Sequence, residues 1–431
     1  MKKLTLLVLL ALVTASAGAK SVRLPIRATE DRQHVPVVFH LDDYPEFSLI
    51  ERSMLGVYLR GRELPSQLDD LNSDGIADEL AVLVDMKKGE QMTLVIQPKK
   101  RHKSFEKQVH AEMYIKSKTP KDGFTYHEAE GKQFYICPVQ EQTFYPGEDS
   151  YHSMHHHGVA FESDLMAYRI YFDKKQTIDV YAKKTPRLEL DACKWYPTDE
   201  QLAEGFGDDI LRVSGMIGVG ACKPYNGKKM VHFDEVESRT ERIVSQGAVR
   251  TICEIEAKGW QTEDGRKVDV ITRYTLYAHH RDVMVEVFFS EPVETMCTGV
   301  QQIGKANFFT ALPEGDSAAK SAQDVCSKGA IVASWGTAFP VNDSIKYGKE
   351  TAGLAVYVPE KYYKQKVSDP RNNLVLLQPG RYIRYYFMVV SLKENNPPAQ
   401  TDAAFWLFCK EWAKSLEEQE SQRNEWHSLR I

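Results

Sequence analysis

Two consecutive runs of alternating apolar and polar residues between Tyr168 and Lys183 constrain the fold of this chain more than any other feature. The apolar positions are Tyr168, Ile170 and Phe172 in the first run and Ile178, Val180 and Ala182 in the second. Alternation with period two is typical of a strand with one buried face. The two runs therefore predict a β-hairpin that turns at Lys174, Lys175 and Gln176.

The pattern also predicts how the two strands pair. If Tyr171 lies opposite Asp179, then Arg169 faces Tyr181 and every apolar side chain lies on one face. A slip by one residue would mix the two faces, so it is disfavoured.

The second face of this hairpin is polar, and a histidine-rich segment leads into it. Its side chains are those of Arg169, Tyr171, Asp173, Asp179, Tyr181 and Lys183. The preceding segment contains His152 and three consecutive histidines, His155, His156 and His157. Solvated sheet faces with mixed charges are common in antiparallel proteins. A loop held by a rigid sheet is also where functional groups concentrate, so we regard this face as the candidate site.

Length and charge narrow the class of protein. A chain of 431 residues is too long for one ordinary core, so we expect two or three domains. The formal net charge is only −5, and this lack of basic character argues against a nucleic-acid-binding protein.

The N-terminus has the three parts of a secretory signal peptide. Lys2 and Lys3 precede an apolar run from Leu4 to Val13, and small residues end at Ala19. We expect cleavage before Lys20 and export to the periplasm or outside the cell. No later segment is long and apolar enough to predict a membrane span.

Residues 20–120 predict a small N-terminal β domain with a calcium-like loop. Asp70, Asn72 and Asp74 precede Gly75, as in the first half of a calcium-binding loop. The carboxylate that closes such a loop is missing, because Ala81 stands at that position, and Asp78 or Glu79 would have to substitute for it. An Asx-rich turn before a strand is the alternative.

Residues 121–431 predict a large β-sandwich that ends in a helix. Further alternating runs predict a hairpin over residues 268–277 and 283–289 and strands over 353–358 and 381–390. Residues 401–418 have a helical apolar stripe, with Thr401 or Asp402 as the cap. The glycine-rich segment 194–230 lacks any phosphate-loop motif, and Asp208 and Asp209 within it either line a cleft or cap a short helix. We expect most of the seven scattered cysteines to be buried small residues.

Three segments of the chain resemble a known family. The segments are residues 157–164, residues 168–183, and residues 67–80 with the sequence QLDDLNSDGIADEL. They are similar to the hallmarks of the family named domain of unknown function four-eight-six-one (DUF4861). The resemblance covers nearly all of the mature chain, and the family commonly has glycine at the position of Ala182.

The resemblance implies an exported protein that is encoded in polysaccharide-degradation gene clusters. Its relatives accompany hydrolases that remove unsaturated uronic acids from pectin-like glycans. The implied fold is a super-β-sandwich similar to that of galactose mutarotases and several lyase domains. The resemblance supplies no catalytic residues.

A carbohydrate-active enzyme is the first functional hypothesis, with β-elimination or hydrolysis as the reaction. For elimination from a uronide, Arg169 would neutralise the substrate carboxylate, and His156 or His157 would take the proton. Tyr171 or Tyr181 would then protonate the leaving oxygen. For hydrolysis, Glu162 and Asp164 would be the paired carboxylates. Without a bulge, their parity directs them into the apolar face.

A metal site is a variant of this hypothesis. On an extended chain His155 and His157 point to the same side, and Glu162 or Asp164 would have to complete the ligand set.

Two alternatives remain open. A non-catalytic glycan-binding protein would present aromatic platforms such as Trp195, Tyr196 or Trp335. A mutarotase-like epimerase would oppose a histidine and a carboxylate across a small pocket.

Overall fold

The computed structural model describes residues 20–28, 30–99, 104–316, 318–319, 325–326, 328–341 and 347–428. The expected signal peptide, residues 1–19, lies outside these. The chain forms two compact units, residues 1–108 with 244–250, and residues 109–243 with 251–431. Residues 109–120, which we expected in the first domain, belong to the second unit because β8 (Val109–Glu112) pairs with β13 (Ala160–Ser163).

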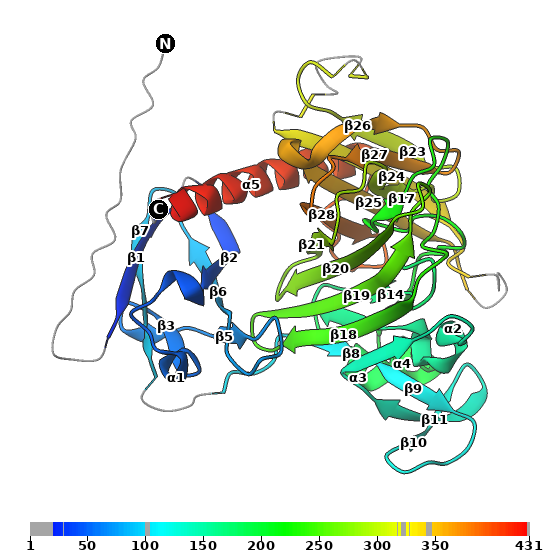
Figure 1. Ribbon diagram of the computed structural model, residues 1–431, viewed down its shortest axis with the longest axis horizontal. Helices are drawn as coiled ribbons and strands as arrows, with labels where there is room; N and C mark the ends of the chain where they lie inside the picture. The colour runs from blue at the N-terminus through cyan, green and yellow to red at the C-terminus, as the bar shows by residue number, and fades with distance from the viewer. Residues whose placement is uncertain are drawn as a thin grey trace. The chain divides into compact units, whose positions relative to one another are not determined.

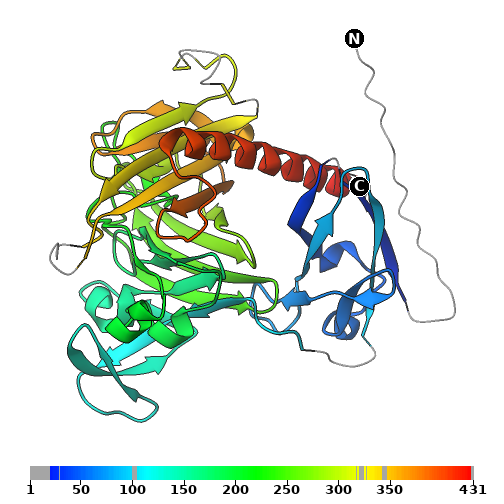
Figure 2. The same cartoon turned by 180° about the vertical axis from the view of Figure 1, so that it is seen from behind.

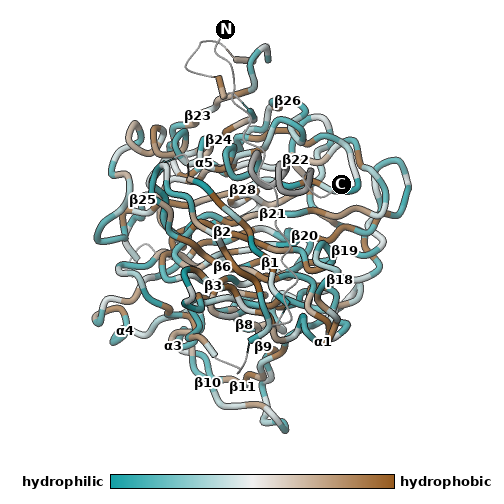
Figure 3. The backbone as a smooth tube through the Cα atoms, turned by 90° about the vertical axis from the view of Figure 1, so that its left-hand side faces the viewer, coloured by the Kyte–Doolittle hydropathy of each residue, from teal (hydrophilic) through white to brown (hydrophobic). Residues whose placement is uncertain are grey.

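The first unit contains two antiparallel sheets whose apolar residues alternate inward. One sheet has the order β1-β7-β3-β4 and the other β2-β6-β5, and β3 contacts both β5 and β6. Brown stretches along β2, β3 and β6 in Figure 3 mark the hydrophobic residues of these strands. The strands are β1 (Val22–Arg27), β2 (Arg32–His40), β3 (Leu55–Leu59), β4 (Arg62–Glu63), β5 (Ser66–Asp69), β6 (Glu79–Met86) and β7 (Gln91–Pro98).

A buried ion cluster holds residues 244–250 within the first unit. The Arg250 guanidinium donates hydrogen bonds to Asp69 Oδ2 at 2.6 and 2.8 Å and to Glu79 Oε2 at 2.5 Å. Gln67 Oε1 accepts the backbone N–H groups of Val249 and Arg250. A tight turn far along the sequence therefore completes this unit.

The second unit is built on a long antiparallel sheet, the large sheet. Its order in the described residues is β12-β18-β19-β20-β21-β28-β25-β24-β23, and Figure 1 shows β18 to β21 side by side. The expected hairpin forms β20 and β21, and the two later expected strands are β25 and β28. The strands are β12 (Glu141–Phe144), β18 (Ser238–Gln246), β19 (Arg250–Gln261), β20 (Lys267–Tyr277), β21 (Asp282–Phe289), β23 (Asn307–Ala311), β24 (Gly329–Ala338), β25 (Glu350–Pro359) and β28 (Tyr382–Ser391).

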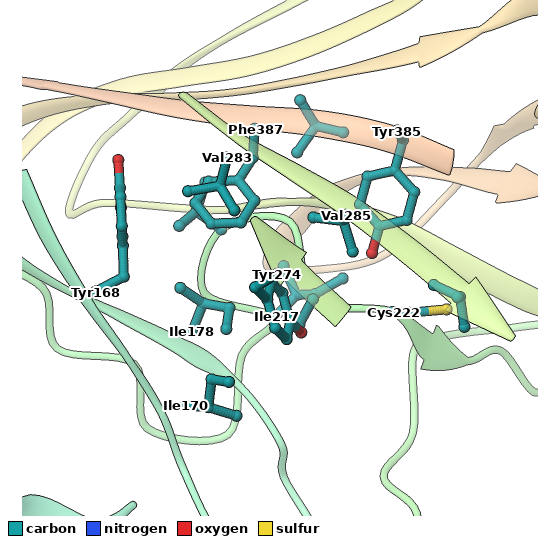
Figure 4. Packing of buried hydrophobic residues seen from close by; sticks show 14 of the residues in the cluster. Tyr168, Ile170, Ile178, Ile217, Cys222, Tyr274, Val283, Val285, Tyr385 and Phe387 are labelled. Atoms are coloured by element: carbon teal, nitrogen blue, oxygen red, sulfur yellow. The ribbon is translucent and has the colours of Figure 1, made fainter. Parts of the chain in front are cut away.

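A smaller antiparallel sheet, the hairpin sheet, packs its apolar face in the same core as the large sheet. Its order is β16-β15-β14-β13-β8, with β14 (Met166–Ile170), β15 (Ile178–Ala182) and β16 (Asp208–Asp209). Figure 4 shows Tyr168, Ile170 and Ile178 of this sheet near Phe387 and Val283 of the large sheet. All five side chains are fully buried. The apolar residues of the hairpin sheet therefore face the core, and its polar residues lie on the opposite face.

Further elements complete the unit. The helix α5 (Asp402–Ser428) contacts β24 and β25, and Figure 2 shows it crossing the yellow and orange strands. Thr401 Oγ1 caps the helix by accepting the N–H of Ala404, and Phe405 and Cys409 lie on its buried face. Two further sheets have the orders β17-β22-β27-β26 and β10-β11-β9. Their strands are β9 (Tyr114–Ser117), β10 (Thr125–Ala129), β11 (Lys132–Pro138), β17 (Lys223–Pro224), β22 (Met296–Gln301), β26 (Tyr363–Val367) and β27 (Asn372–Leu377).

The structure confirms a mainly β fold of several packed sheets with a C-terminal helix. Six of the seven cysteines are buried and none forms a disulfide, as expected for small core residues. None of the described helices has the length and hydrophobicity required to cross a membrane.

Lys223 is a buried cation in this core, and we expect its replacement by Met to stabilise the protein. Its Nζ donates a 2.9 Å hydrogen bond to Thr177 Oγ1, and burial lowers its pKa to about 7. The unfolded lysine stays protonated up to a pKa of about 10.4, so the charged form destabilises the fold fully below pH 7 and progressively less above it. Lys223→Met should raise the free energy of unfolding at about pH 6 by on the order of 2 kcal/mol.

Urea unfolding at about pH 6 and about pH 9 measures this effect, which should be smaller at the higher pH. Lys228→Met, at an exposed position, is the control and should change little. A Lys223→Met protein that is less stable than wild type at both pH values would contradict the prediction.

Candidate functional site

The polar face of the hairpin sheet carries charged residues from five strands. Directly opposite residues of antiparallel strands share a face. One row across the sheet consists of Glu112, Ala160, Arg169 and Asp179, and the next consists of His110, Glu162, Ala167, Tyr181 and Asp209. The sheet therefore brings carboxylates from β8, β13, β15 and β16 to the face of Arg169.

The pairing of β14 with β15 differs from the sequence prediction by two residues. Arg169 lies opposite Asp179 rather than Tyr181, and Ile170 lies opposite Ile178. The connection is longer than predicted, because Tyr171 N donates to Thr177 O and the turn then closes with Gln176 N bonded to Asp173 O. A shift of two keeps each side chain on its predicted face, which is why the alternation alone could not detect it.

Glu162 also lies on the polar face, where the sequence pattern had placed it on the apolar one. The parity argument assumed one continuous strand through Glu162 and Tyr168. In the structure β13 and β14 are separate strands, and Glu162 pairs with Ala167 across the turn at Asp164 and Leu165. This turn reverses the parity, so Glu162 and Arg169 share a face.

This face is covered rather than solvated. Leu190, Cys193 and Trp195 pack on Ala160, Ala167 and Tyr181, and the side chains of Arg169 and Asp179 are 4% and 1% exposed. Burial of charge is costly unless each charge is paired. The covering segment contains α3 (Leu190–Cys193) and α4 (Asp199–Ala203). The alternative of an ordinary solvated sheet face is therefore wrong.

Arg169 is the centre of a buried ion cluster. Its Nη2 donates to Asp179 Oδ2 at 2.7 Å and to Asp209 Oδ2 at 3.1 Å. Its Nη1 donates to Tyr196 Oη at 3.1 Å, and its guanidinium carbon lies 4.5 Å from the centre of the Trp195 ring. Arg169 thus has its charge compensated within the protein.

Tyr171 and Asp209 also belong to this cluster. Tyr171 Oη donates to Asp179 Oδ2 at 2.8 Å, and burial raises the pKa of Tyr171 well above its usual value. Burial, and next the negative charge of Asp179, raise the pKa of Asp209 well above its usual range. Asp209 is 13% exposed and is the most exposed of the three charged groups. Asp209 therefore combines a raised pKa with a position at the most solvent-accessible edge of the Arg169 cluster.

The three consecutive histidines form a tight turn instead of an extended segment. His156 and His157 have φ angles of 42° and 69°, in the left-handed region. His157 stacks on Tyr151 with ring centres 3.8 Å apart, and its Nδ1 lies 2.8 Å from Tyr151 O. A carbonyl only accepts hydrogen bonds, so Nδ1 of His157 carries the proton and Nε2 is left as an acceptor.

Burial lowers the pKa of all three histidines, to about 3 for His157. His155 and His156 are buried and face Tyr114, with ring centres 6.2 Å from it. The predicted metal pair His155 and His157 does not assemble, because the turn directs His157 toward Tyr151.

The other predicted residues lie in separate clusters. Glu162 ion-pairs with Lys183 and accepts the N–H groups of Glu189 and Leu190, and Tyr181 donates to Glu189. This second cluster is buried and ties the covering segment to the sheet. Asp164 instead bonds His279 at 3.1 Å, so the predicted pair of Glu162 and Asp164 is not formed.

The aromatic residues that the sequence proposed as glycan platforms are also separated. Trp195 is fully buried against Arg169, so it offers no open surface. Tyr196 is half-buried beside it, and Trp335 packs on Phe405 of α5 with ring centres 5.3 Å apart.

In the calcium-like loop of the first unit, side-chain oxygens accept hydrogen bonds from backbone N–H groups of the same loop. Asp70 accepts the N–H groups of Asp74 and Gly75, Asn72 accepts that of Asp74, and Asp74 accepts that of Ile76. Asp78 Oδ2 accepts the N–H of Leu71 at 2.6 Å. These are the contacts of an Asx-rich turn, and calcium binding there stays a prediction.

Sequence reasoning missed the importance of Asp209 and Glu112. Asp209 was noted only as one of two aspartates in a glycine-rich segment, and nothing local predicts that β16 adds to the edge of β15. Glu112 lies in a stretch we assigned to the other domain. Its carboxylate contacts His110 and His156, which hold its pKa at about 2 although burial acts to raise it.

Gly158 links the histidine turn to β13, and we expect Gly158→Ala to be strongly destabilising. A Cβ atom at this position would lie 2.0 Å from Ile170 O and 2.9 Å from Glu241 Oε2. Both neighbours are buried and cannot retreat, so the free energy of unfolding should fall by roughly 3 kcal/mol. Urea unfolding measures the loss. Gly348→Ala is the control, since a Cβ there meets nothing within 4 Å; equal stability of the two variants would show that the turn tolerates a side chain.

The sequence matches one protein family, and the fold has similarity to solved structures. A family model described as "Domain of unknown function (DUF4861)" matches residues 27–419. No curated protein matches the sequence. A solved protein in the glycosyl hydrolase family 38 from Enterococcus faecalis is similar with a TM-score of 0.39 and 9% identity, over 86% of this chain and 44% of that one.

An alpha-mannosidase structure from Enterococcus faecalis V583 is similar with a TM-score of 0.38 and 10% identity. That match covers 88% of this chain and 44% of the mannosidase chain. The chain thus spans less than half the length of either structure.

Proposed function

The chain belongs to the DUF4861 family, and from this premise we propose that the protein is an exported carbohydrate-active enzyme that hydrolyses uronic-acid-containing glycan fragments. The resemblance to glycan-degradation proteins and the N-terminal segment typical of a signal peptide support the substrate class and the export. The reaction class is argued from the residues around Arg169.

The observation that carries the proposal is the carboxyl group of Asp209. Breaking a glycosidic bond requires a proton on the leaving oxygen, and the donor must hold its proton near neutral pH. Burial and the charge of Asp179 raise the pKa of Asp209, which is the direction that this role requires. Asp209 Oδ2 accepts two hydrogen bonds, from Arg169 and Trp195, whereas Oδ1 accepts one, from the Leu211 N–H, so Oδ1 is the oxygen with more room for the carboxyl proton.

Asp179 is the neighbouring carboxyl group of this acid. It is 1% exposed and bonded to Arg169 and Tyr171, so it acts on Asp209 through its charge and not by attack on the sugar. Asp179 and Asp209 both bond Arg169 Nη2, and paired carboxyl groups are typical of glycosidases.

Arg169 distinguishes hydrolysis from elimination. A lyase needs a cation that is available to the substrate carboxylate. The Arg169 guanidinium is 4% exposed and already bonded to two aspartates. The arrangement therefore favours hydrolysis over β-elimination.

His157 is the candidate general base for the attacking water. Its Nε2 is an unprotonated acceptor, because Nδ1 donates to Tyr151 O. A pKa of about 3 gives it the basicity of an ordinary carboxylate, whose pKa is about 4.

Two assays run together on a panel of uronic-acid-containing oligosaccharides test the proposal. One measures new reducing ends, and the other measures the ultraviolet absorbance of unsaturated products. Hydrolysis predicts reducing ends without absorbance. Reducing ends with absorbance would replace hydrolysis by elimination. Binding on a glycan array without either signal would mean a binding module, and no cleavage or binding of any glycan would contradict a carbohydrate function.

A further inference from the structure

A second polar cluster lies at the opposite edge of the hairpin sheet from Asp209. It joins β8, the histidine turn and α3 through His110, Glu112, His156 and Asp191. The possible ligand atoms of His110, Glu112 and Asp191 lie within 4.8 Å of one another. Glu112 Oε2 is 3.1 Å from His110 Nε2, and Glu112 Oε1 is 3.3 Å from His156 Nε2.

The buried half of this cluster is not satisfied by protein hydrogen bonds. Glu112 Oε1 and both ring nitrogens of His156 have no hydrogen-bond partner in the described structure. Their side chains are 3% and 0% exposed. Buried polar atoms nearly always have a partner, so Glu112 Oε1 and His156 Nε2, which face each other at 3.3 Å without a hydrogen bond, mark a place for an added ligand.

The donor set fits a transition metal. In a tetrahedral site with zinc–nitrogen bonds of about 2.0–2.1 Å, neighbouring donor atoms are about 3.3 Å apart. The separation of 3.1 Å between Glu112 Oε2 and His110 Nε2 matches that spacing. An imidazole donor favours zinc over calcium or magnesium, which prefer oxygen donors. We propose that His110, Glu112 and Asp191 bind one zinc ion, with His156 against the second oxygen of the Glu112 carboxylate.

Lys194 carries the neighbouring positive charge that zinc would displace. Its Nζ bonds Tyr114 Oη and Asp191 O, each at 3.0 Å, and lies 3.8 Å from Asp191 Oδ1. The lysine side chain is 21% exposed and the Asp191 side chain 83% exposed, so both can move toward or away from solvent. Asp191 thus closes the site from the outside, while Glu112 and His156 hold it from within.

Zinc at this position has a structural consequence for the candidate active site. The His156 carbonyl oxygen accepts from Arg169 Nη1 at 3.4 Å. Fixing the His156 ring would fix the turn that carries this carbonyl and so position Arg169. The ion itself contacts neither Asp209 nor the proposed substrate.

Equilibrium dialysis of the full chain against Zn²⁺, followed by metal analysis, tests the site without any assay of activity. We expect one zinc ion per chain for the wild type and for His152→Gln, which removes an exposed histidine three residues before the triplet. Asp191→Asn should bind zinc at least tenfold more weakly, and His110→Gln should lose it. Circular dichroism verifies that these variants at exposed and half-exposed positions remain folded.

A second readout is the visible absorption of bound Co²⁺, which should appear in the wild type and be absent in His110→Gln. Absence of stoichiometric zinc from the wild type would overturn the proposal, as would unchanged zinc in both His110→Gln and Asp191→Asn. Asp209→Asn should bind zinc like the wild type, so failure of the proposed hydrolysis leaves this result unaffected.

Discussion

Asp209→Asn is expected to lower the turnover number on a cleaved glycan by roughly 100- to 10,000-fold, the range attributed to a general acid. The amide keeps an oxygen that can accept from Arg169 and Trp195, so the cluster should remain assembled. It cannot donate a carboxyl proton to the leaving oxygen. The loss should therefore appear in the turnover number measured by reducing ends, with little change in substrate binding.

The pH dependence provides an independent check of the same group. The donor form of Asp209 exists below its raised pKa, so wild-type activity should fall as the pH rises through that value. Asp209→Asn should lack this alkaline limb. The control is Asp208→Asn, which keeps an oxygen to accept the Asp209 N–H. Equal losses in both variants, or an unchanged alkaline limb in Asp209→Asn, would rule out Asp209 as the acid.

Arg169→Met is expected to reduce the free energy of unfolding by roughly 3–5 kcal/mol at neutral pH, because it leaves the buried carboxylate of Asp179 without its cation. The side chain of Asp179 is 1% exposed, so water cannot replace the lost hydrogen bonds. The variant should regain stability as the pH falls toward about 4, where carboxyl groups protonate and no longer need a cation.

Urea unfolding at several pH values measures this loss of stability and its pH dependence. Two further variants serve as comparisons. Lys174→Met removes an exposed ion pair on the same hairpin and should cost less than about 1 kcal/mol. The double variant Arg169→Met with Asp179→Asn should be more stable than Arg169→Met alone, because it removes one unpaired charge. A small loss that does not depend on pH would show that Arg169 is not the counter-ion of Asp179.

Several parts of the fold followed from local sequence patterns. Period-two alternation was sufficient to place Ile170 on the apolar face and Arg169 on the other, since a side chain's direction along a strand depends only on its position. The aromatic stripe from Phe405 to Leu416 was sufficient for α5. Its polar continuation past Gln419 stays helical, and there Glu420 bonds Arg384 and Tyr386 of β28.

Local sequence patterns identified only part of the candidate site. Arg169, Tyr171 and Asp179 were correctly grouped, because one hairpin carries all three. Glu162 was assigned to the wrong face, because a tight turn at Asp164 reverses the parity that a continuous strand would keep. Trp195 was proposed as an exposed platform, but it is the buried wall of the Arg169 cluster.

The sequence by itself therefore determined the strands, their two faces and the polar identity of the hairpin, because these depend on residues a few positions apart. Only the tertiary structure decided which charges meet. Asp209 reaches Arg169 through pairing of β16 with β15, and Glu112 reaches His156 through pairing of β8 with β13. Such pairings join segments tens of residues apart, and the burial that raises the pKa of Asp209 exists only once the covering segment has packed.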